Sequence, residues 1–194
     1  MGPDLVLESV RINDLTGDDA PALFRYRSDE AVARFQSWSP SSVDDARAFI
    51  DRNGTVPFGQ SDSWYQLAVR RAATGELLGD LGVHFLPDGE QVEIGFTIAP
   101  VHQRRGFGAL AVVALLDHLF AGMKRHRVLA SVDPRNQASQ ALLRKVGMRL
   151  EAHFRQSLFF KGEWVDDLVF ALLRTEWREQ PVSCGAPRRG AGRE

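Results

Sequence analysis

The chain has 194 residues, of which 44% are hydrophobic and 25% are charged, and it contains one cysteine. These values are typical of a single globular domain, and they exclude collagen-like chains, wholly disordered chains, disulfide frameworks and cysteine-based metal clusters. The formal net charge of −1 argues against a dedicated nucleic-acid-binding protein.

Targeting and metal-binding signals are missing from the sequence. The longest apolar run, residues 109–116, is shorter than the roughly 18 to 20 residues that a membrane span needs. The N-terminus carries an acid where a signal peptide has basic residues, and the histidines show no metal-ligand spacing. We therefore expect a cytoplasmic protein with no membrane span and no metal site.

The chain begins with a predicted strand and two predicted helices. Residues 5–12 alternate apolar and polar side chains, as a half-buried strand does. Thr16 and Ser42 are each followed three residues later by an acid, which is a helix-capping pattern. Apolar residues at helical spacing come next in both cases, so the sequence predicts helices over 16–27 and 42–52.

An aromatic loop, residues 35–40, joins the two helices and either closes over a ligand or staples the helices together. The rest of the chain alternates strand-like and helical patterns up to residue 174. The predicted strands there are 63–70, 77–85, 91–98, 127–132, 148–154, 157–160 and 164–174, and the predicted helices begin at Phe107 and Asn136.

This order predicts a mixed α/β (α+β) fold with a mostly antiparallel sheet and helices on both faces. The strands 91–98 and 127–132 are the one expected parallel pair, because a helical crossover joins them. One domain is expected over residues 1–178. The remaining residues, 179–194, are rich in Gly and Pro and are predicted to form a disordered tail.

The segment from Gln103 to Ala109 leads into the predicted helix that begins at Phe107, and it has features of a phosphate-binding loop. Gly106 and Gly108 leave backbone N–H groups accessible, the helix start is electropositive, and two arginines precede the glycines. A pyrophosphate is the expected ligand. Alternatively, the glycines serve only close packing and both arginines lie in solvent.

A dinucleotide-binding fingerprint competes with this interpretation. Gly106, Gly108 and Ala111 match G-x-G-x-x-A, and Asp133 follows the next strand. However, residues 99–105 separate the first glycine from its strand, and too little chain follows for a second nucleotide-binding half. The fingerprint is therefore disfavoured.

The motif Gln103-x-x-Gly106-x-Gly108, followed by Asn136-x-x-Ser139-x-x-Leu142 and Gly147-Met148, resembles the acetyl-CoA-binding core of the GNAT acetyltransferase superfamily. Segments outside this core, among them 7–11, 93–96 and 162–166, resemble the branch that contains the RimJ/RimL-type ribosomal-protein N-terminal acetyltransferases and many acetyltransferases of small amines. The resemblance covers about residues 5–178. It implies a single GNAT-like domain whose parallel strand pair splays apart, with acetyl-CoA as cosubstrate.

The resemblance implies that pantetheine lies between the splayed strands and meets backbone near the end of 91–98. Asn136 either contacts the pantetheine arm or only caps its helix. The residues expected to bind acetyl-CoA are Thr97, Ile98, Gln103, Arg104, Arg105, Gly106, Phe107, Gly108, Ala109 and Asn136.

The expected reaction is direct attack of an amine on the thioester, which requires a base for the amine proton. Glu93 is the candidate base, because a carboxyl on a partly buried strand is otherwise costly, although a cross-strand ion pair would also explain it. Leu143 stands where many relatives have a tyrosine acid. Ser139 is either the proton donor or a solvent-facing side chain, and His84 and His102 are further base candidates.

The acceptor is either a protein N-terminus or a small cationic amine such as an aminoglycoside or polyamine. Trp38, Trp64 and Trp164 are candidates for an apolar wall, and Asp166 is a candidate cation-binding acid. A non-catalytic acyl-CoA sensor is the alternative of another class. The sequence leaves open whether the chain forms a homodimer.

Overall fold

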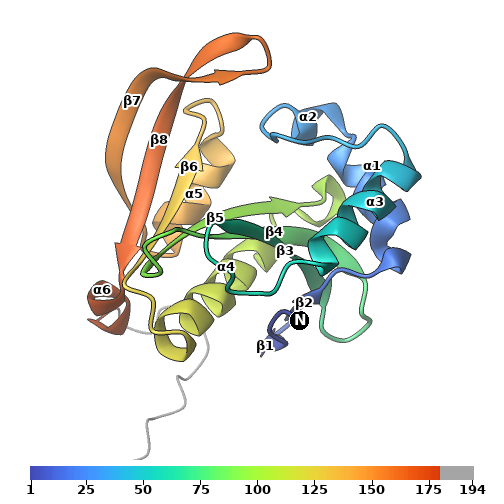
Figure 1. The fold of residues 1–194 in the computed structure, drawn as a ribbon, viewed down its shortest axis with the longest axis horizontal. Helices are drawn as coiled ribbons and strands as arrows, with labels where there is room; N and C mark the ends of the chain where they lie inside the picture. The colour runs from blue at the N-terminus through green and yellow to red at the C-terminus, as the bar shows by residue number, and fades with distance from the viewer. Residues whose placement is uncertain (180–194) are drawn as a thin grey trace, which may run out of the picture.

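The computed structural model describes residues 1–179 and contains one sheet covered by helices on both faces (Figure 1). The strands are β1 Leu5–Leu7, β2 Val10–Asp14, β3 Ser63–Arg71, β4 Leu77–Phe85, β5 Gln91–Ile98, β6 Arg127–Val132, β7 Arg149–Phe160 and β8 Glu163–Leu173. The helices are α1 Ala20–Arg27, α2 Glu30–Ala33, α3 Val43–Gly54, α4 Phe107–Asp117, α5 Gln137–Lys145 and α6 Arg174–Glu179, with short helical turns at Gly17–Asp19, Pro100–His102 and His118–Gly122.

The sheet has the order β1-β2-β3-β4-β5-β6-β8-β7, and its neighbours are antiparallel except for β5 and β6. This confirms the predicted mixed sheet with one parallel pair. In Figure 1, β6, β8 and β7 stand at a steep angle to β3, β4 and β5, so the sheet opens where β5 and β6 meet.

Two clusters of buried side chains hold the layers together. The larger one packs α4 and the end of α5 against one face of the sheet, and the smaller one packs α1 and α3 against the other. The helix starts are those that the sequence predicts: the Asp19 carboxylate accepts from the Thr16 N–H (2.7 Å), and the Ser42 hydroxyl accepts from the Asp45 N–H (3.0 Å). None of the described helices is long and apolar enough to span a membrane.

Four element predictions need correction. Residues 5–12 form the hairpin of β1 and β2, because Glu8 takes a left-handed turn conformation (φ 51°). The predicted strands 148–154 and 157–160 are one strand, β7, with register shifts in the pairing to β8. The helices α2 and α6 were not predicted. The proposed disordered tail lies outside the described residues, apart from Glu179 at the end of α6.

Candidate functional site

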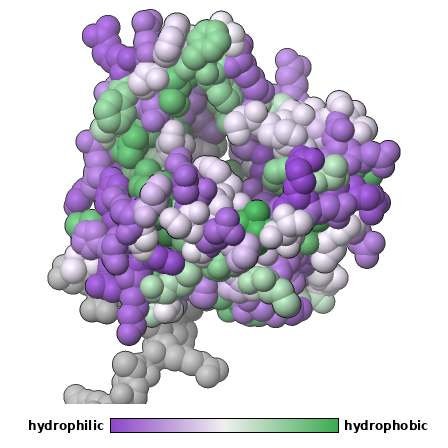
Figure 2. Space-filling model, viewed as in Figure 1, coloured by the Kyte–Doolittle hydropathy of each residue, from purple (hydrophilic) through white to green (hydrophobic). Residues whose placement is uncertain are grey.

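A cavity of about 530 Å³ lies where the end of β5, the start of α4 and one side of α5 meet, with α2 opposite. Figure 2 shows the surface hollowed between the β7–β8 hairpin and the segment that carries α2. The lining residues are Ala31, Val32, Phe35, Gln36, Phe96, Thr97, Ile98, His102, Gln103, Arg104, Gly106, Phe107, Gly108, Ala109, Asn136, Ala138, Ser139, Ala141, Leu142 and Lys145.

The start of α4 contributes residues 106–109 to this lining, and these residues form a cradle of backbone N–H groups. Gly106 precedes the helix in a left-handed conformation (φ 84°), and the Leu110 N–H donates to the Gly106 carbonyl (3.1 Å). The N–H groups of residues 107–109 come before that bond, so they point out of the helix start toward a ligand. Arg104 lines the cavity beside them, whereas Arg105 does not. These positions agree with the predicted phosphate loop except at Arg105.

Gly108 serves packing as well as ligand access. A Cβ at this position would lie 2.8 Å from Leu142 Cδ1 and 3.3 Å from Ile98 Cγ1. Any larger residue would therefore push α4 away from α5 and from the end of β5. The packing explanation for this glycine therefore holds, and its place in the cavity lining is compatible with phosphate binding.

The strands β5 and β6 part beside the cavity. Their pairing runs from Gln91 with Arg127 to Glu93 with Leu129, and no further pairs follow. The predicted splay is therefore present, with Glu93 at its vertex. Further along β5, the Ile98 carbonyl accepts from the Gln103 side chain (2.9 Å), so the loop is tied to the strand end.

Thr97, near the end of β5, has a buried hydroxyl with unsatisfied hydrogen-bonding capacity among the described residues. The residue itself is buried, and it lines the cavity. A buried hydroxyl without a partner is costly unless a ligand supplies one. The sequence predicts only a backbone contact at Thr97, whereas the structure also offers its side-chain hydroxyl as a candidate binding group.

On α5, Asn136 and Ser139 both line the cavity. The Asn136 side-chain oxygen accepts from the Ser139 N–H (3.1 Å), which caps the helix. The capping role is therefore present, and it does not use the carboxamide nitrogen, which can still donate to a ligand. Lys145 lines the same side and was missed, although residues 138, 141 and 145 share one helical face with it by spacing.

Glu93 is half-buried and carries a perturbed carboxyl. Burial raises its pKa, the neighbouring His84 lowers it, and the charge of Asp167 raises it further. The distance from Glu93 Oε2 to His84 Nδ1 is 3.8 Å, and His84 Nε2 lies 3.4 Å from the exposed Asp62 carboxylate. The ring of His84 is stacked on Trp64, with centroids 5.0 Å apart.

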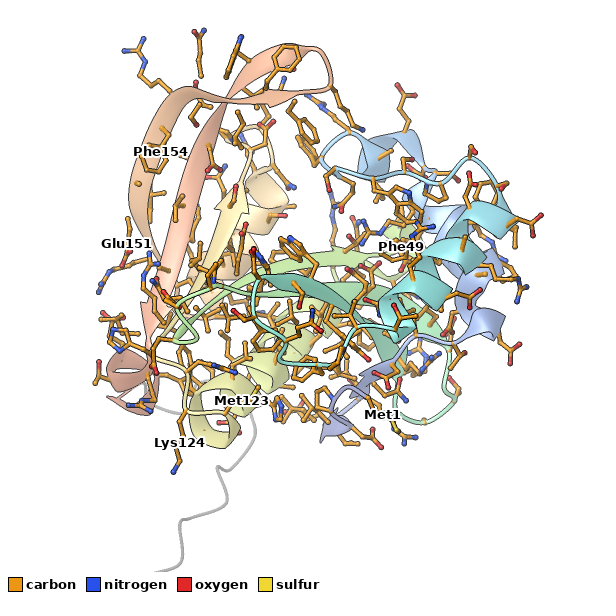
Figure 3. All side chains as sticks on the ribbon, viewed as in Figure 1. Met1, Phe49, Met123, Lys124, Glu151 and Phe154 are labelled. Atoms are coloured by element: carbon orange, nitrogen blue, oxygen red, sulfur yellow. The ribbon has the colours of Figure 1, made fainter. Side chains whose placement is uncertain are left out.

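The structure does not bring the predicted acceptor residues Trp38, Trp164 and Asp166 into the cavity lining. Trp38 stacks on Phe49 of α3, labelled in Figure 3, with ring centroids 4.3 Å apart. Trp38 therefore joins the loop 35–40 to α3, while Phe35 and Gln36 of the same loop line the cavity. Trp164 is exposed, and Asp166 bonds to His153 and to backbone.

Comparison with known proteins agrees with this geometry. A family model described as an acetyltransferase (GNAT) domain matches residues 9–149. The chain belongs to the GNAT acetyltransferase family. This acetyltransferase is 29% identical over 167 residues to the uncharacterized N-acetyltransferase YnaD of Bacillus subtilis, a match that covers 86% of this chain and 94% of YnaD.

A GNAT-family acetyltransferase from Bacillus anthracis has a crystal structure with a TM-score of 0.81 to this acetyltransferase and 26% identity, covering 90% of this chain and all of that one. The [ribosomal protein uS5]-alanine N-acetyltransferase of Escherichia coli is 27% identical over 84 residues, which are 43% of each chain. These findings confirm the predicted family and the fold class, and they are consistent with the RimJ/RimL-like branch. The protein is an acyltransferase, and acetyl-CoA is its acyl donor.

Proposed function

We propose that this acetyltransferase moves the acetyl group of acetyl-CoA to a primary amine, and that Glu93 takes the amine proton. The position of Glu93 carries the proposal: it is a half-buried carboxyl at the vertex of the β5–β6 splay, where a thioester between the strands would end. Burial raises the pKa of Glu93, which makes its carboxylate a better proton acceptor than an exposed one.

The residues of the cavity fit acetyl-CoA. The N–H groups of residues 107–109 and the Arg104 guanidinium would hold its pyrophosphate. The Asn136 carboxamide and the unpartnered Thr97 hydroxyl would hydrogen-bond to the pantetheine arm or the acyl carbonyl. When bound, the cosubstrate supplies an activated acyl carbon whose bond to sulfur breaks as the amine attacks.

The proton chemistry falls to this chain's own residues. A primary ammonium must lose one proton to Glu93 before its lone pair can attack, and the new amide nitrogen loses a second. His84 lies between Glu93 and the exposed Asp62, so it would pass the first proton from Glu93 toward solvent. Ser139, the hydroxyl-bearing residue of α5, would give its proton to the departing thiolate and take up the second proton from the amide nitrogen, so its hydroxyl is restored.

One feature favours a non-catalytic acyl-CoA sensor, which is the absence of the tyrosine acid. Leu143, which stands at that position, is fully buried in the core and cannot reach a thiol. An enzyme and a sensor predict different behaviour when the base is removed. Glu93→Gln in an enzyme would lower turnover and leave acetyl-CoA binding unchanged.

The experiment measures amine acetylation and acetyl-CoA binding, by thermal shift, in wild type, Glu93→Gln and Ser139→Ala. We expect Glu93→Gln to lower kcat by about 10²-fold or more, with an unchanged shift on acetyl-CoA. Glu90→Gln, an exposed acid just before the same strand, is the matched control and should retain full activity. If Glu93→Gln turns over at the wild-type rate, the proposed base is wrong.

A further inference from the structure

Three aspartates are buried in the described part of the chain, and one of them lacks a cation. Asp19 is paired with Arg70, and Asp80 with Arg27. Asp167, on β8, is 8% exposed, and its described partner is the Ser131 hydroxyl (2.6 Å). No Lys, Arg or His nitrogen in residues 1–177, whose side chains the structure describes, forms an ion pair with it. Buried charges are normally paired, so this carboxylate calls for a cationic ligand.

Asp167 lies across the β5–β6 splay from Glu93, on the side formed by β6 and β8. Its partner Ser131 lies on β6, two residues beyond the last β5–β6 pair, whereas Glu93 is the last paired residue on β5. The two carboxylates therefore flank the splay, close enough for the charge of Asp167 to act on Glu93. A ligand that reaches the splay from this face meets both.

His84, the side chain paired with Glu93, cannot neutralise Asp167 as well. His84 Nε2 lies beside Asp62, so a proton on His84 is already matched by that carboxylate. His84 Nδ1, which faces Glu93, is buried and has no hydrogen-bond partner. The local charge therefore remains negative whether or not His84 is protonated.

The sheet face beside these groups is open and has an aromatic edge. Gly82 and Gly95 are cross-strand partners next to the pair of His84 and Glu93. A Cβ on Gly95 would meet no atom within 4 Å, so there is free space above it. The Trp64 ring extends over Gly82, within 3.0 Å of where a Cβ would be. An aliphatic chain would fit over Gly95 and against this ring.

The hairpin of β7 and β8 limits the size of what can enter. Lys161, at the hairpin turn, donates to the Ala33 carbonyl at the end of α2 (2.6 Å), and the two elements approach each other at the top of Figure 1. Phe154, labelled on β7 in Figure 3, is the cross-strand partner of Asp167. While this bond is closed, a small molecule passes the arch without disturbing it, whereas the end of a folded protein would first have to open it.

From this arrangement we infer that the acceptor is a small aliphatic diamine, with its reacting nitrogen at Glu93 and its second ammonium paired with Asp167. The inference rests on the proposed function. Two ammonium groups balance two carboxylates. After the reacting nitrogen has given its proton to Glu93, the remaining ammonium still balances Asp167.

The test compares 1,4-diaminobutane, butylamine and a peptide with a free N-terminal alanine as acceptors. Wild type should prefer the diamine. Asp167→Asn should lower kcat/KM for the diamine by about 30-fold or more, mainly through KM, which is the effect of losing a buried charge pair. Its kcat/KM for butylamine should change by less than about threefold. Asp51→Asn, an exposed acid on α3, removes the same charge and should change neither value.

Two further measurements separate failure of this inference from failure of the proposed function. Glu93→Gln should still bind 1,4-diaminobutane in a calorimetric titration while losing turnover, whereas Asp167→Asn should lose the binding. Ser131→Ala, which keeps the charge but frees the carboxylate, should raise KM for the diamine by a smaller factor. Equal effects of Asp167→Asn on all three acceptors, or a wild-type preference for the peptide, would overturn the inference and leave Glu93 as the base.

Discussion

Removing His84 or Asp167 should move the pH profile of this enzyme in opposite directions. Glu93 must be deprotonated to act as a base, so the acid limb of kcat/KM follows its pKa in the free enzyme. His84 lowers that pKa and Asp167 raises it. His84→Gln should therefore shift the acid limb to higher pH, and Asp167→Asn should shift it to lower pH.

The size of the first shift follows from the geometry. Unit charges about 4 Å apart attract by about 1 kcal/mol in water and about 4 kcal/mol at an effective dielectric constant of 20. The Glu93–His84 distance is 3.8 Å and both side chains are mostly buried, so this pair lies between the limits. An imidazole is charged for only part of the pH range, which reduces the effect. We expect a shift of about one pH unit, equivalent to about 1.4 kcal/mol.

The assay follows initial rates of thiol release from pH 5 to 9 with one acceptor throughout, so that titration of the acceptor contributes equally to every profile. Asp167→Asn should move the limb by about half a unit to one unit, within the range of neighbouring-charge effects. Glu90→Gln should not move it. Shifts of both variants in the same direction would refute the assignment of this limb to Glu93.

Two further predictions concern buried positions. Gly108→Ala should weaken acetyl-CoA binding about tenfold, measured by calorimetry, and should destabilise the protein by about 1 kcal/mol through contact with Leu142. The control Gly54→Ala, which has open space around it, should be neutral or stabilising in the same thermal-shift measurement. Asp80→Asn should lower the free energy of unfolding by about 3 to 5 kcal/mol in urea titrations, because it leaves the buried Arg27 unpaired, and an unchanged unfolding midpoint would contradict this.

The sequence was a good guide where a local pattern determines the structure. Capping pairs marked the starts at Thr16 and Ser42, and glycines marked the start of α4, because these features act within one turn of chain. The pattern failed at Glu8, where a non-glycine residue takes a left-handed turn and the alternation continues into the second strand. It also failed at α2, which is only four residues long and too short for a periodic signal.

The candidate site residues likewise fall into those that a local pattern predicts and those that only strand pairing brings together. The cradle residues 106–109 are contiguous, so one motif was enough to find them. Asp167 and His84 are separated from Glu93 by 74 and 9 residues along the chain, and their proximity to it depends on strand pairing that no local pattern encodes. The prediction for Trp38 was wrong because an aromatic residue in a loop has the local pattern of a binding residue. Its ring instead stacks on Phe49, which the loop sequence does not reveal.

The buried Asp80 also determines how the site can move. It accepts hydrogen bonds from Tyr26 and Arg27 of α1 and from Gln66 of β3, and Arg27 in turn bonds to Gln36 in the cavity lining (2.7 Å). The helical side of the cavity is therefore fastened to the central strands. The opposite side is joined to it by the exposed Lys161–Ala33 hydrogen bond, which costs about 1 kcal/mol to break. Opening for acceptor entry and product release should therefore be a hinge motion of the β7–β8 hairpin against a stationary helical wall.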